Sequence, residues 1–308
     1  MKHVRVLLMG LLLLSAAAAA QVRLNKPRKF PKTIPAGNYS GITPIGEGRY
    51  AVVDDKAAGD GFSIFRLDID SVTGKLRSAA NEGFFPSGQP NRDMEGICYF
   101  PLAGTLFISG EADNEVYEYR LDGQRTGRRL AMPDCFKTAR SNRGLEALTY
   151  NAQTHLFWTT SEQPLPGDTL LRLQSFGDDL LPRHQYFYRP DAPVKEQQFH
   201  GVSALCALDD GRLLVLEREI YIPKKKVGAK TYISIYAVQP SEPNAVLEKT
   251  LITAFTTRLT LTGRKYANYE GLCQPFPGIL LLIADSQNRY KGVLRDWFRT
   301  IVVTAVVE

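Results

Sequence analysis

The sequence contains only four cysteines, and it lacks several common catalytic motifs. Cys98, Cys206 and Cys273 recur at one place of an internal repeat, which is typical of small buried residues rather than of a disulfide framework. A Gly-x-Ser-x-Gly motif, a zinc signature and a phosphate-binding P-loop are absent, so the enzyme classes that they define are not indicated. No long stretch keeps a 3.6-residue apolar period, and no Gly/Ser-rich linker divides the chain. These absences favour one all-β domain.

The first 20 residues resemble a secretory signal peptide. Lys2 and Arg5 precede an apolar run over 6–14, and small residues at 16–20 predict cleavage after about Ala20. The run is too short to span a bilayer, so we expect a periplasmic or secreted monomer without a membrane span. Its single domain would cover 21–308. Cleavage lowers the formal net charge from +6 to +4, since 36 basic residues then face 32 acidic ones. This weakly favours an acidic ligand and does not indicate nucleic acid.

A five-fold repeat is the main positive feature. Its copies are SGITPI (40–45), RDMEGI (92–97), RGLEAL (143–148), HGVSAL (200–205) and ANYEGL (267–272). In this register the ring position, third from the end of each copy, holds Thr43, Glu95, Glu146, Ser203 and Glu270. Each copy leads through a turn into an apolar strand that ends in acid. This second set is Asp54 or Asp55, Glu111, Glu162, Glu217 and Asp285.

The repeat predicts an array of small antiparallel sheets. Unit two reads as four short strands over 95–101, 104–111, 115–122 and 126–132. Four-stranded units repeated radially predict a β-propeller. The fifth unit is one strand short, so the segment at about 21–34 is expected to supply its outer strand and close five blades. The wide step from 203 to 270 leaves six blades as an alternative.

The ring position would line the central channel. Three glutamates facing one channel repel each other unless they are protonated or bridged by a cation, and oxygen ligands suit Ca²⁺. The ring holds neither His nor Cys, which argues against Zn²⁺ or copper. The alternative for the second acidic set is structural, because such acids also cap turns by accepting backbone N–H bonds.

Basic residues recur three places before the ring position, in the set Ser40, Arg92, Arg143, His200 and Ala267. We expect Arg92 and Arg143 to project into one mouth of the channel. There they would either clamp an anionic group with two-oxygen forks or only neutralise neighbouring acids. His200 is a candidate general acid or base.

The phrases DMEGICYF, NRGLEALTY, FHGVSALCALDDGRLLVLERE and NYEGLCQ resemble the phytase-like domain family, which is described as having esterase-like activity. The resemblance covers about 38–308. It implies a secreted or periplasmic propeller related in name to the calcium-dependent alkaline phytases, which carry denser Asp and Lys clusters than this chain. The family's EG-type motif matches at Glu95, Glu146 and Glu270, and its LERE motif matches at Glu217.

The sequence therefore predicts a Ca²⁺-dependent hydrolase of phosphate or carboxylic esters with a small anionic substrate. The expected metal ligands are Glu95, Glu146, Glu270, Glu217, Glu111, Glu162 and Asp285, and the expected catalytic residues are His200, Arg92 and Arg143. Two alternatives are open. One is a lactonase of the gluconolactonase type, for which Asn268 beside Glu270 and Asn142 near Glu146 would supply amides. The other is a ligand-binding propeller with a structural calcium.

Overall fold

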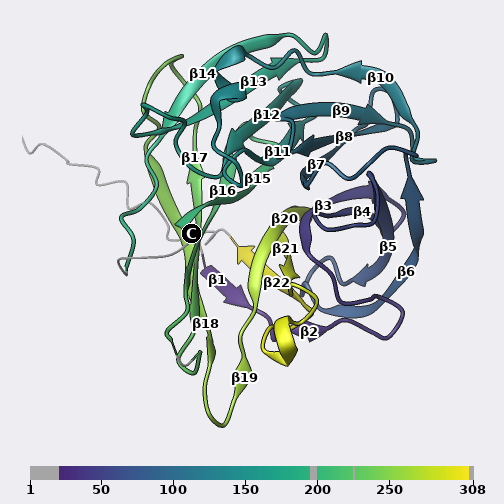
Figure 1. Ribbon diagram of the computed structural model, residues 1–308, viewed down its shortest axis with the longest axis vertical. Coiled ribbons are helices and arrows are strands. Elements are labelled where there is room, and N and C mark those ends of the chain that lie inside the picture. Colours follow the sequence, from purple (N-terminus) through teal and green to yellow (C-terminus); the bar gives the residue numbers. More distant parts are fainter. Residues whose placement is uncertain (1–20, 195–199, 225, 305–308) are drawn as a thin grey trace, which may run out of the picture.

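The computed structural model describes residues 21–194, 200–224 and 226–304, which form five antiparallel sheets around a common axis (Figure 1). The chain is a five-bladed β-propeller, as the repeat predicts. The leader predicted at 1–20 lies outside the described residues. Among the described residues, no helix is long and apolar enough to cross a membrane.

The first three blades follow one another along the chain, each a four-stranded meander. Blade 1 consists of β3 (Tyr39–Gly46), β4 (Arg49–Asp54), β5 (Gly61–Ile69) and β6 (Leu76–Pro86). Blade 2 consists of β7 (Met94–Phe100), β8 (Thr105–Gly110), β9 (Glu115–Tyr119) and β10 (Arg125–Arg129). After the 3₁₀ helix η1 (Asp134–Thr138), blade 3 consists of β11 (Leu145–Asn151), β12 (Leu156–Ser161), β13 (Leu171–Gly177) and β14 (Pro182–Tyr188).

The last two blades differ from this plan at their outer edges. Blade 4 adds a short fifth strand and consists of β15 (His200–Ala207), β16 (Leu213–Tyr221), β17 (Lys230–Val238), β18 (Lys249–Leu259) and β19 (Arg264–Lys265). Blade 5 has β20 (Asn268–Phe276), β21 (Ile279–Asp285), the 3₁₀ helix η2 (Tyr290–Gly292) and β22 (Trp297–Thr304).

The N-terminus closes the propeller. Strand β1 (Gln21–Leu24) pairs antiparallel with β22, Gln21 lying opposite Thr304, and β2 (Arg28–Lys29) pairs with the beginning of the same strand. In Figure 1 the purple β1 lies beside the yellow β22. The predicted closure is confirmed. Because β1 covers the edge of β22, this strand is not left open to another chain.

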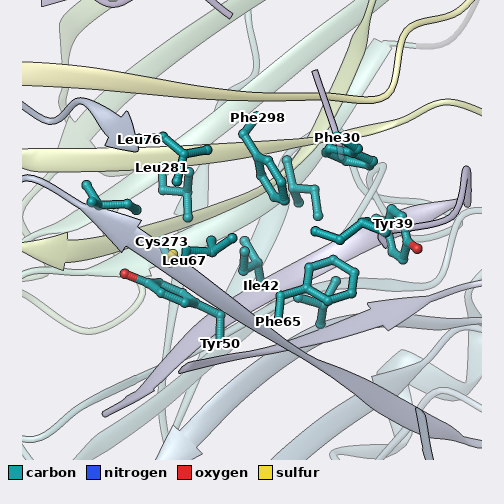
Figure 2. Close-up of a cluster of buried hydrophobic side chains, with 14 of the residues drawn as sticks. Phe30, Tyr39, Ile42, Tyr50, Phe65, Leu67, Leu76, Cys273, Leu281 and Phe298 are labelled. Carbon is teal, nitrogen blue, oxygen red and sulfur yellow. The ribbon is translucent and has the colours of Figure 1, made fainter. Parts of the chain in front are cut away.

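Five apolar clusters hold the blades together, one at each interface between neighbouring blades. Figure 2 shows the cluster between blades 5 and 1, where the rings of Phe30 and Phe298 lie 4.4 Å apart between centroids. Burial of each such side chain contributes about 1.5–3 kcal/mol to the free energy of unfolding. Cys98, Cys206 and Cys273 are buried in these clusters as free thiols, which confirms their prediction as small core residues.

Candidate functional site: the acidic end of the channel

The innermost strand of every blade carries a β-bulge at the same level. These five strands, β3, β7, β11, β15 and β20, pack side by side in a closed circle around the channel. Their register shifts lie between Tyr39 and Gly41, Met94 and Ile97, Leu145 and Ala147, Val202 and Ala204, and Tyr269 and Gly271. A bulge leaves one extra residue unpaired and redirects its side chain. The bulged residues are Ser40, Glu95, Glu146, Ser203 and Glu270.

The ring position of blade 1 is thus Ser40, and the prediction of Thr43 is wrong by three residues. Thr43 instead lines a smaller cavity at the other end of the channel. The residue after each bulge is small because the inner strands approach closely there. A Cβ atom on Gly41 would lie 2.4 Å from the carbonyl oxygen of Glu95. The Ser40–Gly41 pair therefore matches the Glu–Gly pairs of blades 2 and 5.

An apolar collar divides the channel. It consists of the residue two places after the ring position in each blade, namely Ile42, Ile97, Leu148, Leu205 and Leu272. A cavity of about 420 Å³ lies on the side of the glutamates and one of about 200 Å³ on the other. The glutamates therefore stand on an apolar floor that closes the channel below them.

We call the larger space the acidic cavity. Seven carboxylates line it, Asp55, Glu95, Glu111, Glu146, Glu162, Glu270 and Asp285. Three cationic side chains share the space, Lys56, Arg143 and Arg218. Burial and mutual repulsion raise the pKa of Glu95 and of Glu146 well above the usual carboxyl range, and burial likewise raises that of Asp285. The cavity thus carries more acid than its own cations offset.

The second strand of each blade supplies the side chains of a second ring around the cavity. In blade 4 this ring position is Arg218, one residue later than the Glu217 that the sequence indicates. Gly201 lies opposite Arg218, as Asn268 lies opposite Asp285. In blade 3, Glu162 occupies the equivalent position, because its N–H donates to the carbonyl of Gly144, which lies two residues before the bulge as Gly201 does in blade 4. Successive side chains of a strand point to opposite faces, so Arg218 enters the acidic cavity and Glu217 does not.

Arg218 is the internal counter-ion of the acidic cavity. Its Nη2 atom lies 2.8 Å from Glu270, 3.3 Å from Glu162 and 3.5 Å from Glu146. Although burial opposes it, the attraction of these carboxylates, Glu270 first, raises the pKa of Arg218 further. The guanidinium therefore joins carboxylates from blades 3 and 5, at the place where three ring glutamates were expected to share a cation.

The part of the cavity away from Arg218 is less well compensated. Among the residues that the structure describes, Asp55 Oδ1 is buried without a hydrogen-bond partner, while Asp55 Oδ2 lies 3.1 Å from Lys56, which also contacts Asp93. Burial and the charges of Glu146, Asp55 and Glu270 raise the pKa of Glu95. In the part of the chain that the structure describes, no three His, Cys, Asp or Glu side chains form a ready-made metal site.

Glu111 and Arg143 lie at the blade 2 to blade 3 side of the acidic cavity. Glu111 Oε1 accepts the N–H of Gly144 at 2.9 Å, and Arg143 Nη1 lies 3.0 Å from Glu162 Oε2. By accepting this backbone N–H, Glu111 has the structural, turn-capping role that the sequence left open for the second acidic set. Asp54 behaves in the same way, because its carboxylate accepts the N–H groups of Asn38 and Lys56. Arg143 faces the cavity as predicted.

Arg92 does not reach the acidic cavity, so the expectation that both arginines project into one mouth is wrong. Its fork is bound by Asp113, with Nε at 2.8 Å and Nη2 at 2.7 Å from the two oxygens. Nη2 also donates to the carbonyl of Glu115, and the guanidinium lies 4.4 Å from the centre of the Tyr117 ring. Arg92 therefore fastens the turn between β8 and β9.

His200 and Glu217 meet each other outside the acidic cavity. His200 Nε2 lies 3.4 Å from Glu217 Oε2, and Lys249 Nζ lies 2.7 Å from Glu217 Oε1. Tyr188 and the backbone N–H of Asp191 donate to the same carboxylate. Although burial opposes it, these hydrogen bonds, that of His200 first, hold the pKa of Glu217 below its usual range. The group joins blade 3 to blade 4.

One family model matches most of this chain. A model of the family described as "Phytase-like: Esterase-like activity of phytase" matches residues 34–285. No curated protein has a sequence that matches this chain significantly.

Three of the solved structures to which this chain is similar are two lyases and a luciferin-regenerating enzyme. A streptogramin B lyase matches with a TM-score of 0.43 and 11% identity over 94% of this chain and 100% of its own. Virginiamycin B lyase from Staphylococcus aureus matches with a TM-score of 0.42 and 12% identity over 92% of this chain and 99% of its own. A luciferin-regenerating enzyme matches with a TM-score of 0.48 and 11% identity over 92% of this chain and 98% of its own. Similarity at this level says nothing about the chemistry of this chain.

Proposed function

Because the chain belongs to the phytase-like family, named for the esterase-like activity of phytase, we propose that it hydrolyses phosphate or carboxylic esters in the acidic cavity. One observation carries the proposal. Carboxylates and cations from all five blades converge on one recess of about 420 Å³ with an apolar floor. Buried carboxylates are costly unless they are paired or bind a cation, so such a gathering points to a chemical role. We also propose that the protein is exported and acts as a monomer.

The donor chemistry of the cavity fits a Ca²⁺ ion. All candidate ligands are hard oxygens, the acid is in excess, and Asp55 Oδ1 has no partner among the described residues. Glu146, Glu162 and Glu270 are paired with Arg218. We therefore place the cation with Asp55, Glu95 and Asp285, and leave Glu217 out of the ligand set. A bound Ca²⁺ would polarise the ester oxygen and lower the pKa of a water molecule.

The side chains of the protein supply the remaining functions. Lys56 and Arg143 lie at the cavity as positive charges that hold an anionic substrate group. Glu95 stands on the apolar floor beside the proposed cation, whose charge would keep its carboxylate ionised, and the ionised carboxylate would accept a proton from the attacking water. We assign this proton transfer to Glu95 rather than to His200, because His200 contacts Glu217 outside the cavity.

The test is a substrate panel for the purified protein with Ca²⁺ or with the chelator EGTA. An ester hydrolase should release nitrophenol from p-nitrophenyl phosphate or p-nitrophenyl acetate in Ca²⁺ and stop in EGTA. A lactonase should instead acidify a lactone solution. Asn268 favours that alternative, because its amide donates to Glu270 at 2.8 Å and thereby puts an amide beside the carboxylates. Failure of every substrate, with thermal stability that still depends on Ca²⁺, would show a binding propeller and overturn the proposal.

A further inference from the structure

A second cavity lies far from the channel axis, where the outer strand of blade 5 meets blade 1. Its volume is about 390 Å³, close to that of the acidic cavity. It is lined by Arg23, Asn25, Lys26, Pro27, Arg28, Thr73, Lys75, Leu76, Phe298 and Thr300. These residues come from β1, β2 and the segment between them, from β22, and from the turn before β6 together with the first residue of β6. We call this space the basic cleft.

The charge of the basic cleft has one sign. Four cationic side chains line it, Arg23, Lys26, Arg28 and Lys75, and none of the described residues around it is acidic. The sequence shows the same bias, because residues 21–46 contain five basic residues and no acidic one. The adjoining β5–β6 hairpin carries Asp68 and Asp70, which share Arg77 and so leave one net negative charge there. Four cations beside that one charge leave the cleft with a net positive charge.

Neutral acceptors hold the two arginines in place. Arg23 donates to the backbone carbonyl of Thr73 and to the amide oxygen of Asn25, both at 3.1 Å. Arg28 donates to the carbonyl of Arg77 at 2.7 Å. Each guanidinium therefore reaches from blade 5 to blade 1, and its hydrogen-bond partners among residues 21–194, 200–224 and 226–304 include no carboxylate. Such an arrangement positions the forks and leaves their charge available to a ligand.

The floor of the cleft is buried and ordered. Leu76 and Phe298 belong to the apolar cluster between blades 5 and 1, where Figure 2 shows them close together. Thr300 is buried beside them, accepts a hydrogen bond from Asn25 and donates one to Gly74. The cations therefore stand around a recess with a fixed floor rather than on a flat surface.

We propose that the basic cleft binds a soluble ligand that carries two or more phosphate groups. Guanidinium forks match the oxygens of phosphate, and the two lysines that line the cleft add point charges. Four positive charges are complementary to a ligand with three or four negative ones. The volume is larger than one phosphate requires, which favours a ligand with several. This site is distinct from the acidic cavity and does not depend on the proposed hydrolysis.

The test is calorimetric titration of the protein with inorganic pyrophosphate in EGTA, so that any phosphate binding through calcium in the acidic cavity is silent. The test variant is K26Q/K75Q, and its matched control is K29Q/K32Q. The control removes the same charge from exposed lysines of the same segment that do not line the cleft. We expect one site in the parent and the control, and at least about a tenfold loss of affinity in the test variant.

Three results would overturn the proposal. The first is the absence of pyrophosphate binding in the parent. The second is an equal loss of affinity in K26Q/K75Q and K29Q/K32Q, which would show a general surface field. The third is equal binding of citrate, or Lys26- and Lys75-dependent binding to phosphatidylglycerol vesicles in place of pyrophosphate. Pyrophosphate binding that depends on Lys26 and Lys75 supports the proposal even if no ester is hydrolysed.

Discussion

Replacing Arg218 tests the internal counter-ion of the acidic cavity. Arg218→Met keeps most of the volume of the side chain and removes its charge, which leaves Glu146, Glu162 and Glu270 without their shared partner. Two unit charges about 4 Å apart attract each other by about 4 kcal/mol at an effective dielectric constant of about 20. Breaking a buried ion pair by removing one partner costs about 3–5 kcal/mol. We expect a loss of this size in the free energy of unfolding at neutral pH in EGTA.

Urea unfolding followed by circular dichroism measures this loss. The double variant R218M/E270Q should recover part of it, about 0.5–3 kcal/mol, because it also removes the carboxylate nearest to Arg218. Arg212→Met is the control, since Arg212 is exposed and pairs with the exposed Asp210, and it should change stability by less than about 1 kcal/mol. If R218M is as stable as the R212M control, or if E270Q adds to the loss of stability in R218M instead of relieving it, Arg218 is not the counter-ion of these carboxylates.

Three further predictions follow from the other contacts. The folded-state pKa of Glu95 and Glu146 lies above the unfolded value, so their contribution to the free energy of unfolding in EGTA should be largest at acid pH and fall as pH rises through the raised pKa. Ca²⁺ should flatten this profile, and a melting temperature that rises with pH in EGTA would contradict the prediction. Deleting 21–24 exposes the edge of β22 and should cause aggregation visible by light scattering, and an unchanged, soluble variant would speak against closure by β1. Arg143→Gln should lower kcat/KM for p-nitrophenyl phosphate roughly tenfold or more but not for the neutral acetate, and equal losses on both would make Arg143 part of the scaffold.

The repeat predicts the fold well because it reports on backbone pattern. The apolar strands and turns give five blades, and the missing strand of the fifth unit points to the N-terminal segment that forms β1. The regular step from copy to copy also places Glu95, Glu146 and Glu270 at equivalent bulges of their blades, and the structure has all three lining one cavity.

What the repeat cannot show is where a bulge changes the register. Blade 1 has its bulge at Ser40, so alignment by length alone selects Thr43. In blade 4 a difference of one residue turns Glu217 out of the cavity and Arg218 into it. The small residue after each bulge and the arginine inside the acidic LERE motif are the two signals that reveal the true register.

The partners of Arg92 are equally hidden from the sequence. Asp113 lies 21 residues later in a turn, and only the folded blade brings its carboxylate to the guanidinium. The same spacing before the ring position therefore places Arg143 at the acidic cavity and Arg92 inside blade 2. Regular spacing predicts level and blade, whereas the contacts of each side chain depend on the neighbouring turns.

The most direct test of the central claim is calcium-dependent ester hydrolysis by Glu95→Gln beside Glu118→Gln. Both changes neutralise a buried glutamate, but Glu118 pairs with Thr105, Thr126 and Arg128 within blade 2, away from the acidic cavity. We expect Glu95→Gln to lose hydrolysis at every Ca²⁺ concentration and to bind calcium more weakly, whereas folded Glu118→Gln should keep both. Parental hydrolysis and parental calcium affinity in Glu95→Gln would show that Glu95 is neither a ligand nor a base.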